Sequence, residues 1–236
     1  SGVPQDGKVS MGPEFNNVQL RVSIFPTVLG EKVVCRIFDP STRSFDIDKL
    51  GLDSETKEKF INLVNKPNGL ILLTGPTGSG KTTAIYCALH YLLTKHGTAV
   101  SIASVEDPVE VPIPTVSQAQ LNPAMEFTFA SALRSLMRQD PQIIMVGEIR
   151  DPETAGIAVQ AGLTGHLVIS TVHSGTTAGV FARLINMGIE PFLLASSILG
   201  VMGVRLVRKN CSFCAIPYEP DAALLKLLTQ EEIDNA

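Results

Sequence analysis

The segment GPTGSGKT, residues 75–82, has the spacing of a phosphate-binding loop: a glycine, four residues, and then Gly-Lys-Thr. The glycines let several backbone N–H groups point into one hollow, and a helix that begins there adds its positive end. In this chemistry Lys81 reaches the β- and γ-phosphates of ATP and the Thr82 hydroxyl ligates Mg²⁺. We therefore expect a nucleotide to be bound by Gly75, Pro76, Thr77, Gly78, Ser79, Gly80, Lys81, Thr82 and Thr83.

Acidic residues follow two apolar runs. Glu148 follows IIMV, residues 143–146, and Glu106 and Asp107 end the run ASVED, residues 103–107. An acid after a buried strand is often only a solvated strand end, but beside a phosphate loop it can hold the water shell of Mg²⁺ or orient the attacking water. Glu148 is the leading candidate for catalysis and metal binding, and Glu106 is the second for both. The sequence leaves open which acid is the general base.

Two histidines flank the apolar run 167–172. His173 follows the run, at the end where strands of a parallel sheet present their ligand sites, so it could hydrogen-bond the γ-phosphate. His166 precedes the run and is expected to lie further from the phosphates. The other reading of both is a polar strand end, hydrogen-bonded to nearby backbone. His90 and His96 are expected on the surface.

The residues from 54 onward alternate between helical and strand-like patterns. Helices are expected over 54–65, 81–95, 128–139, 152–163 and 176–187, and strands over 70–75, 99–106, 142–148 and 166–172. This alternation predicts an α/β fold whose mostly parallel sheet is covered on both faces. Its ligand sites lie at the carboxyl ends of the strands, where the candidate residues stand.

The first part of the chain has a different pattern. Residues 1–17 are rich in Gly, Pro, Asn and Gln and predict an irregular leader. The runs 18–25 and 31–38 predict an antiparallel pair of strands, which suggests the end of a small preceding domain over 1–38. Residues 39–53 are expected to be a linker, and 54–236 the main domain.

Composition limits the class of protein. The 236 residues carry 19 Lys and Arg, 23 Asp and Glu and a net charge of −4, which gives no general attraction to nucleic acid. No apolar run approaches the roughly 20 residues that cross a bilayer, and the start has no signal-peptide pattern, so we expect a soluble, unexported chain. Four cysteines are too few and too unevenly placed for a disulfide framework, which favours a reducing cytoplasm.

Four segments together resemble the type II secretion and type IV pilus assembly ATPases. GPTGSGKTT (75–83), ASVEDPVE (103–110), LMRQDPQIIMVGEIRDPETA (136–155) and GLTGHLVISTVHS (162–174) look like that family's Walker A, Asp, Walker B and His boxes. PQDGKV (4–9) and residues 20–39 resemble the last strands of its PAS-like domain, which precedes a RecA-like ATPase core. The resemblance continues over residues 185–214.

The resemblance implies a Mg-dependent ATPase that works as a hexameric cytoplasmic ring. Its ATP hydrolysis would drive pilus or pseudopilus assembly through an inner-membrane platform protein, without a nucleic-acid partner. Arg21 and Arg36 match arginines that the preceding domain lends to the nucleotide; their other reading is the solvated face of a hairpin. Arg134, Arg138 and Arg150 match arginines that line the site or the subunit boundary, and a spacing of four would place Arg134 and Arg138 on one helix face. Because most of the preceding domain is missing, the chain resembles a fragment whose docking to the secretion platform is expected to be lost.

The CSFC pair, Cys211 and Cys214, matches half of a four-cysteine site of the family. Zinc takes four ligands, and no Cys or His follows this pair in the sequence. We therefore expect no complete zinc site in this chain.

Two other classes of P-loop protein share this loop. A nucleic-acid translocase with a RecA-like core would carry basic or aromatic loops toward its strand, and the absence of Trp and the presence of three Tyr disfavour it. A nucleotide-dependent switch without a motor cycle is the remaining alternative.

Overall fold

The computed structural model describes residues 2–15, 18–39, 45–217 and 226. The N-terminal residues form a three-stranded antiparallel sheet of β1 (Gln5–Ser10), β2 (Gln19–Thr27) and β3 (Gly30–Phe38), with β2 in the centre. The predicted antiparallel pair is confirmed. The irregular leader is wrong for residues 5–10: backbone pairing with β2 forms a strand from a polar segment that has no apolar alternation of its own.

The connecting segment enters the main body through a short 3₁₀ helix, η3 (Ile47–Leu50), capped by the Asp46 carboxylate. Helix α1 (Ser54–Val64) follows, and the Asp53 side chain accepts a hydrogen bond from the Thr56 N–H at 2.9 Å, which satisfies one donor of its first turn. Of the predicted linker, residues 40–44 lie outside the described part of the chain.

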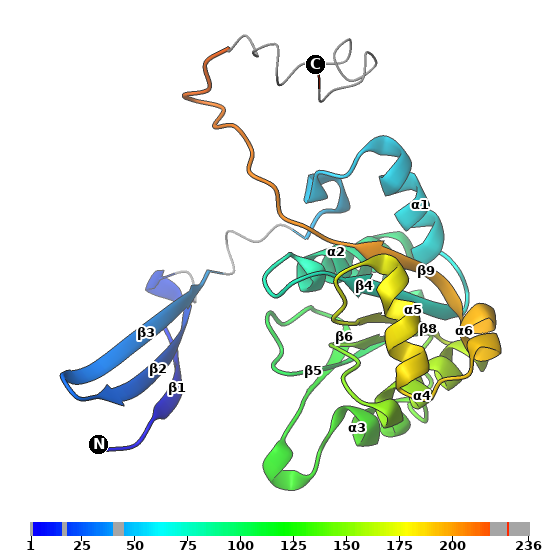
Figure 1. Cartoon of the computed structure of the whole chain (residues 1–236), viewed down its shortest axis with the longest axis horizontal. Helices are drawn as coiled ribbons and strands as arrows, with labels where there is room; N and C mark the ends of the chain where they lie inside the picture. The colour runs from blue at the N-terminus through cyan, green and yellow to red at the C-terminus, as the bar shows by residue number, and fades with distance from the viewer. Residues whose placement is uncertain (1, 16–17, 40–44, 218–225, 227–236) are drawn as a thin grey trace. The chain divides into compact units, whose positions relative to one another are not determined.

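The main body contains a six-stranded parallel sheet, which confirms the predicted α/β fold class. Its spatial order is β6 (Val116–Gln120), β5 (Ile102–Glu106), β7 (Ile143–Val146), β8 (Leu167–Thr171), β4 (Gly69–Thr74) and β9 (Ile198–Gly203). The strands other than β7 are labelled in Figure 1. Strands β4, β5, β7 and β8 are buried along their whole length and are mostly apolar, as expected for strands covered on both faces.

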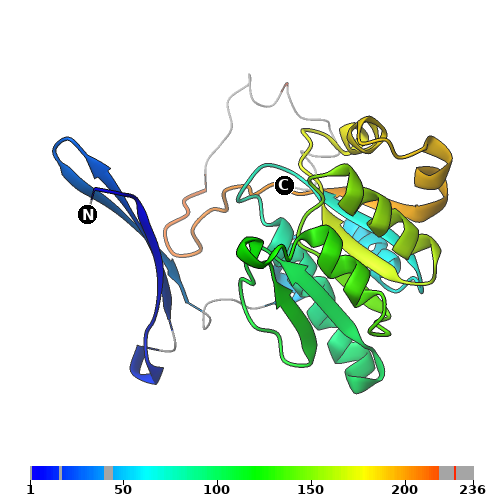
Figure 2. The same cartoon turned by 90° about the horizontal axis from the view of Figure 1, so that it is seen from below.

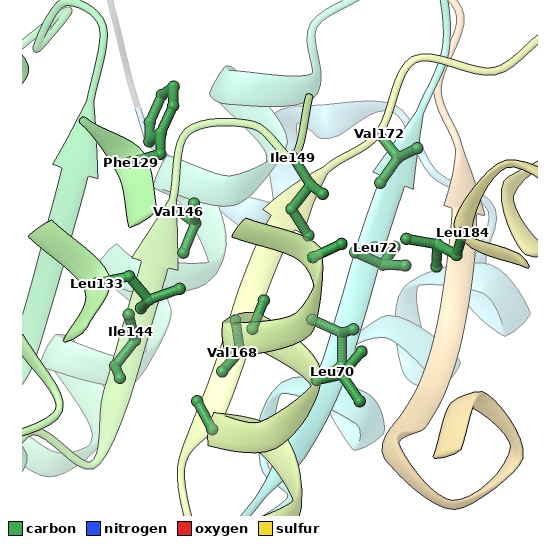
Figure 3. Packing of buried hydrophobic residues seen from close by; sticks show 14 of the residues in the cluster. Leu70, Leu72, Phe129, Leu133, Ile144, Val146, Ile149, Val168, Val172 and Leu184 are labelled. Carbon is green, nitrogen blue, oxygen red and sulfur yellow. The ribbon is translucent and has the colours of Figure 1, made fainter. Parts of the chain in front are cut away.

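Helices cover both faces of this sheet, as Figure 2 shows from below. Helix α2 (Lys81–His96) packs with α1 on one face; α3 (Phe129–Leu136), α4 (Pro152–Leu163), α5 (Thr177–Asn186) and α6 (Pro191–Ser197) pack on the other. Side chains alternate between the two cores, since Leu70 and Leu72 of β4 join the α3–α6 side while Ile71 and Leu73 join the α1–α2 side. Figure 3 shows Leu72 and Val168 in the first of these cores.

In the main body, strand β6, helix α6 and strand β9 were not predicted, and helix α3 is shorter than predicted. Strand β6 is a polar edge strand, while α6 and β9 fall in a segment whose glycines interrupt the apolar pattern. Helix α3 ends at Leu136, because the chain tightens there: the Arg138 N–H bonds the Ser135 carbonyl at 3.1 Å. The predicted placement of Arg134 and Arg138 on one helix face is therefore wrong.

The end of the chain forms a separate unit, Leu206–Ala236, of which residues 206–217 and 226 are described. Its described part contains a turn over 212–214, closed by a hydrogen bond from the Ala215 N–H to the Cys211 carbonyl at 2.9 Å. Across all described residues, no helix combines the length and apolar character that crossing a membrane requires.

Candidate active site

Four neighbouring strands of the parallel sheet bring the candidate residues to one edge. The phosphate loop follows β4, His173 follows β8, Glu148 follows β7, and Glu106 is the last residue of β5. Since these strands are parallel and adjacent, their carboxyl ends open on the same side of the sheet. The fold thus gathers residues that are up to about a hundred positions apart in sequence.

The phosphate loop runs between β4 and the first turn of α2, with Thr82 and Thr83 in that turn. Lys81 is buried, and its Nζ donates to the carbonyls of Gly75 and Pro76 at 2.9 Å each. Burial lowers the pKa of the Lys81 ammonium, an effect that the nearby Glu148 carboxylate opposes. The lysine therefore lies inside the loop, ready to exchange backbone carbonyls for phosphate oxygens.

The loop fits a phosphate group in two further respects. The Ser79 Oγ is buried and has no hydrogen-bond partner among the described residues, so a polar atom faces the loop without compensation. Gly75 lies so close to the chain after β9 that a Cβ there would be 2.3 Å from the Val204 carbonyl oxygen. A loop held this tightly presents its N–H groups in a fixed arrangement.

Glu148 is mostly buried, with 14% of its side chain exposed, and lies between the Arg150 guanidinium and the His173 ring. Arg150 donates from Nη2 to its Oε1, and this bond raises the pKa of the guanidinium. The other oxygen, Oε2, lies 3.5 Å from the His173 Nε2 and is buried without a hydrogen bond in the described structure. One carboxylate oxygen is thus anchored and the other is available for a metal, a water or a proton.

Residues of β8 hold Glu148 on both sides, a support that sequence reasoning missed. The Thr171 Oγ1 donates to the Gly147 carbonyl at 2.9 Å, and the Ile149 N–H donates to the Thr171 carbonyl at 2.9 Å. The two polar residues that end β8, Ser170 and Thr171, are the one signal in the sequence that could have indicated it.

His173 is positioned by the end of β4. The Thr74 Oγ1 donates to the carbonyl of Ser174, and the Ser174 N–H donates back to it at 3.1 Å. The His173 side chain is 44% exposed and borders a pocket of about 540 Å³ between the end of β8 and α5. None of the residues 75–83 lines this pocket. His166 lies at the opposite end of β8, and its Nδ1 is 3.2 Å from the Ala161 carbonyl oxygen. It lies away from the phosphate loop, as expected.

Glu106 is buried, and its carboxylate accepts three hydrogen bonds. The donors are the Tyr86 hydroxyl at 2.5 Å to Oε2, and the Ser104 hydroxyl at 2.7 Å and the Gln118 amide at 3.0 Å to Oε1. Its oxygens are thus occupied by neutral protein groups, whereas the neighbouring Asp107 is exposed.

The two candidate arginines of the N-terminal sheet lie directly opposite each other, Arg21 on β2 and Arg36 on β3, and Lys8 of β1 is the cross-strand partner of Arg21. Directly paired residues share one face of a sheet, so these cations form a row. The Arg21 guanidinium also lies 4.6 Å from the centre of the Phe38 ring.

The remaining candidates are more exposed. Arg134 forms an ion pair with Glu153 of α4, and Arg138 lies in the exposed segment after α3. Cys211 and Cys214 are exposed free thiols. Within the described ranges, no group of three or more His, Cys, Asp or Glu side chains is placed to hold a metal ion.

Comparison with known proteins relates this chain to secretion ATPases. Residues 1–234 match the family described as Type II/IV secretion system protein. The chain is 48% identical to the type II secretion system ATPase E of Vibrio cholerae serotype O1 over 98% of its own length and 45% of the relative. It is 47% identical to the type IV pilus assembly ATPase PilB of Acinetobacter baylyi, over 98% of this chain and 40% of that protein. The chain thus spans less than half the length of each of these two relatives.

Solved structures agree with this relation. The pilus retraction motor PilT with bound ADP superposes with a TM-score of 0.69 at 29% identity, covering 86% of this chain and 58% of that one. The ATPase DotB of Yersinia pseudotuberculosis gives 0.70 at 26% identity, covering 87% and 57%. The match to the family over nearly every residue, together with these relatives, shows that the chain belongs to the type II/IV secretion system ATPases.

Proposed function

We propose that this chain is a Mg-dependent ATPase and the motor subunit of a type II secretion or type IV pilus assembly system. One observation carries the proposal: a phosphate loop with an unpartnered buried hydroxyl, Ser79 Oγ, shares a sheet edge with a buried carboxylate that has one unpartnered oxygen, Glu148 Oε2. A γ-phosphate site and an acid that can act on water are the two requirements of ATP hydrolysis.

Each residue then has a defined part. The loop N–H groups and Lys81 hold the phosphates. The Thr82 hydroxyl would ligate Mg²⁺, and Glu148 would hold water molecules of its shell. When bound, the metal would neutralise the negative charge that develops on the phosphates. Glu148 orients the attacking water and accepts its proton, and His173 hydrogen-bonds the γ-phosphate. Glu106, whose oxygens are held by three protein donors, acts as a buried negative charge beside Glu148.

Assembly extends the proposal to a hexameric ring. Arg21 and Arg36, on one face of the N-terminal sheet, would approach the nucleotide of a neighbouring subunit and offset charge in the transition state. The Vibrio relative is a type II secretion system ATPase and the Acinetobacter relative a type IV pilus assembly ATPase, which supports a role in secretion or pilus assembly. A cytoplasmic location and an inner-membrane platform protein as partner are part of the same proposal.

Glu148→Gln tests the assignment of the base. The amide keeps the size of the side chain but cannot accept the proton of water, so kcat for ATP hydrolysis is expected to fall roughly 100- to 10,000-fold. The dissociation constant for ATP, measured with a fluorescent analogue, should change less than about threefold, because the phosphate loop is intact.

Glu58→Gln is the matched control, since Glu58 is exposed on α1 and its loss changes net charge by the same amount. Full turnover in Glu148→Gln would remove this residue from the mechanism.

A further inference from the structure

Tyr86 connects the helix of the phosphate loop with the buried carboxylate of Glu106. It lies on α2, one turn after Thr82, and is 1% exposed. Its hydroxyl donates to the Glu106 Oε2 at 2.5 Å, and this is the hydrogen bond that Oε2 receives in the described structure. The bond joins two elements that meet at the site: helix α2 begins there, and strand β5 ends there at Glu106.

Removing the hydroxyl would have a large local effect. The other two donors, Ser104 and Gln118, both bond Oε1, so Oε2 would be left buried without a partner. A buried carboxylate oxygen that loses its donor carries a desolvation cost, which favours a shift of the side chain toward another donor. Burial and the bond to Glu106 also raise the pKa of the Tyr86 phenol, so it stays a donor at neutral pH.

A change at Glu106 would be transmitted to Glu148. The Gly147 N–H donates to the Val105 carbonyl at 2.8 Å, and a Cβ on Gly147 would be 3.4 Å from the Glu106 Cα. The backbone of Glu106 therefore lies in contact with the residue that precedes Glu148, with no side chain between them.

The ring of Tyr86 is itself supported by the connecting segment. Phe45 packs edge-on against it, with ring centroids 5.1 Å apart and an interplanar angle of 66°. Aromatic pairs in this arrangement fix each other's orientation. Phe45 thereby helps to hold the Tyr86 hydroxyl in its orientation toward Glu106.

We propose that Tyr86 is a positioning residue of the ATP site, whose hydroxyl fixes the Glu106 carboxylate so that the chain at Gly147 and Glu148 keeps its catalytic geometry. This assignment rests on the proposed ATPase function. It adds to that function a residue that touches neither nucleotide nor metal and acts through Glu106.

Tyr86→Phe tests the role, because it keeps the ring and its packing and removes one oxygen. We expect kcat for ATP hydrolysis to fall roughly 10- to 100-fold while the KM for ATP stays within about twofold. The matched control is Tyr91→Phe on the same helix, where the hydroxyl accepts only a 3.3 Å bond from the Asn65 amide, and where kcat should be unchanged.

A double-mutant cycle separates positioning from a general structural effect. In Glu106→Gln, kcat is already reduced, and adding Tyr86→Phe should reduce it less than about twofold further, since the carboxylate that the hydroxyl positions is gone. Ser104→Ala, which removes the hydroxyl donor to Oε1 from β5, provides a second variant should Tyr86→Phe fold poorly by circular dichroism; it should lower kcat with an unchanged KM.

Three results would overturn the proposal: kcat of folded Tyr86→Phe within twofold of the parent, equal losses from Tyr86→Phe in both backgrounds, or full turnover in Glu106→Gln. A parent chain that hydrolyses no ATP would defeat the proposed function and this role together. Normal parent turnover that depends on Glu148 but not on Tyr86 would defeat the positioning role alone.

Discussion

At the scale of single residues, the site depends on carboxylates held by different partners. Glu148 has one oxygen bonded to Arg150 and the other unpartnered, whereas both oxygens of Glu106 are occupied by neutral donors. The Glu148 Oε2 has no hydrogen-bond donor in the described structure and is open to a proton or a metal-bound water, whereas the Glu106 carboxylate already accepts three hydrogen bonds. This difference favours Glu148 as the base, a choice that the sequence left open.

His173 is expected to distinguish ATP from ADP. His173→Ala removes a hydrogen bond to the γ-phosphate, which ADP lacks, so the ratio of the ADP to the ATP dissociation constant should fall by roughly tenfold. Competition against a fluorescent nucleotide measures both constants. His90→Ala, an exposed position on α2, serves as control, and an unchanged ratio in His173→Ala would return the histidine to a structural role.

Cysteine reactivity tests the residue-scale electrostatics. Burial, with a further contribution from the Asp46 carboxylate, raises the pKa of the Cys87 thiol to about 11. A thiol is neutral below its pKa, so at pH 8 roughly 0.1% of Cys87 would be thiolate and alkylation should be slow. Hydrogen bonds from the backbone at Phe213 and from Cys214 lower the pKa of the exposed Cys211, so it should react faster.

Peptide mapping after timed treatment with iodoacetamide reads both rates. Equal labelling of Cys87 and Cys211 in the folded chain would contradict the buried placement of Cys87, and labelling in urea provides the reference in which the two should converge.

Residues with a local pattern were predictable, and residues that act through contacts were not. The phosphate loop is continuous in sequence, and Glu148 and His173 each follow an apolar run, so their positions at strand ends could be predicted. The bond between Tyr86 and Glu106 joins positions 20 apart on a helix and a strand, and only their packing reveals it. Thr171 was missed for the same reason.

At the scale of elements, the tight turn after β4 determines the shape of the phosphate loop. Gly75 has φ of +147°, a region that favours glycine, and the Val204 carbonyl leaves no room for a Cβ. Gly75→Ala should therefore lower the free energy of unfolding by about 1–3 kcal/mol and weaken ATP binding.

Gly156→Ala is the matched control on α4, where a Cβ meets no atom within 4 Å, and it should raise the free energy of unfolding by about 0.5–1 kcal/mol. Urea unfolding followed by circular dichroism measures both variants. A Gly75→Ala chain as stable as its parent would show that the contact with Val204 is looser than the structure has it.

Element prediction succeeded where burial dominates. Strands β4, β5, β7 and β8 are mostly apolar, and helix α2 carries apolar residues at helical spacing, so their types followed from the sequence. Strands β1 and β6 are polar edge strands that exist because a neighbour supplies hydrogen bonds. Their own residues show no hydrophobic periodicity from which these strands could have been predicted.

At the scale of the whole molecule, the proposed catalytic groups come from two sheets. The parallel sheet holds the phosphate loop and Glu148, and the row formed by Lys8, Arg21 and Arg36 belongs to the antiparallel sheet. Like charges that face each other directly across strands repel, so an anion brought to this row would stabilise it. Under the proposed function, a triphosphate held by another subunit would be such an anion, and assembly would complete the site.

The most direct test is the steady-state rate of Mg-ATP hydrolysis per chain, measured over a wide range of protein concentration beside Lys81→Ala as the inactive reference. The account predicts hydrolysis that requires Lys81 and a rate per chain that rises with concentration, as subunits complete one another's sites. A rate per chain that stays flat over the range in which sedimentation shows association, or a rate that Lys81→Ala leaves unchanged, would contradict it.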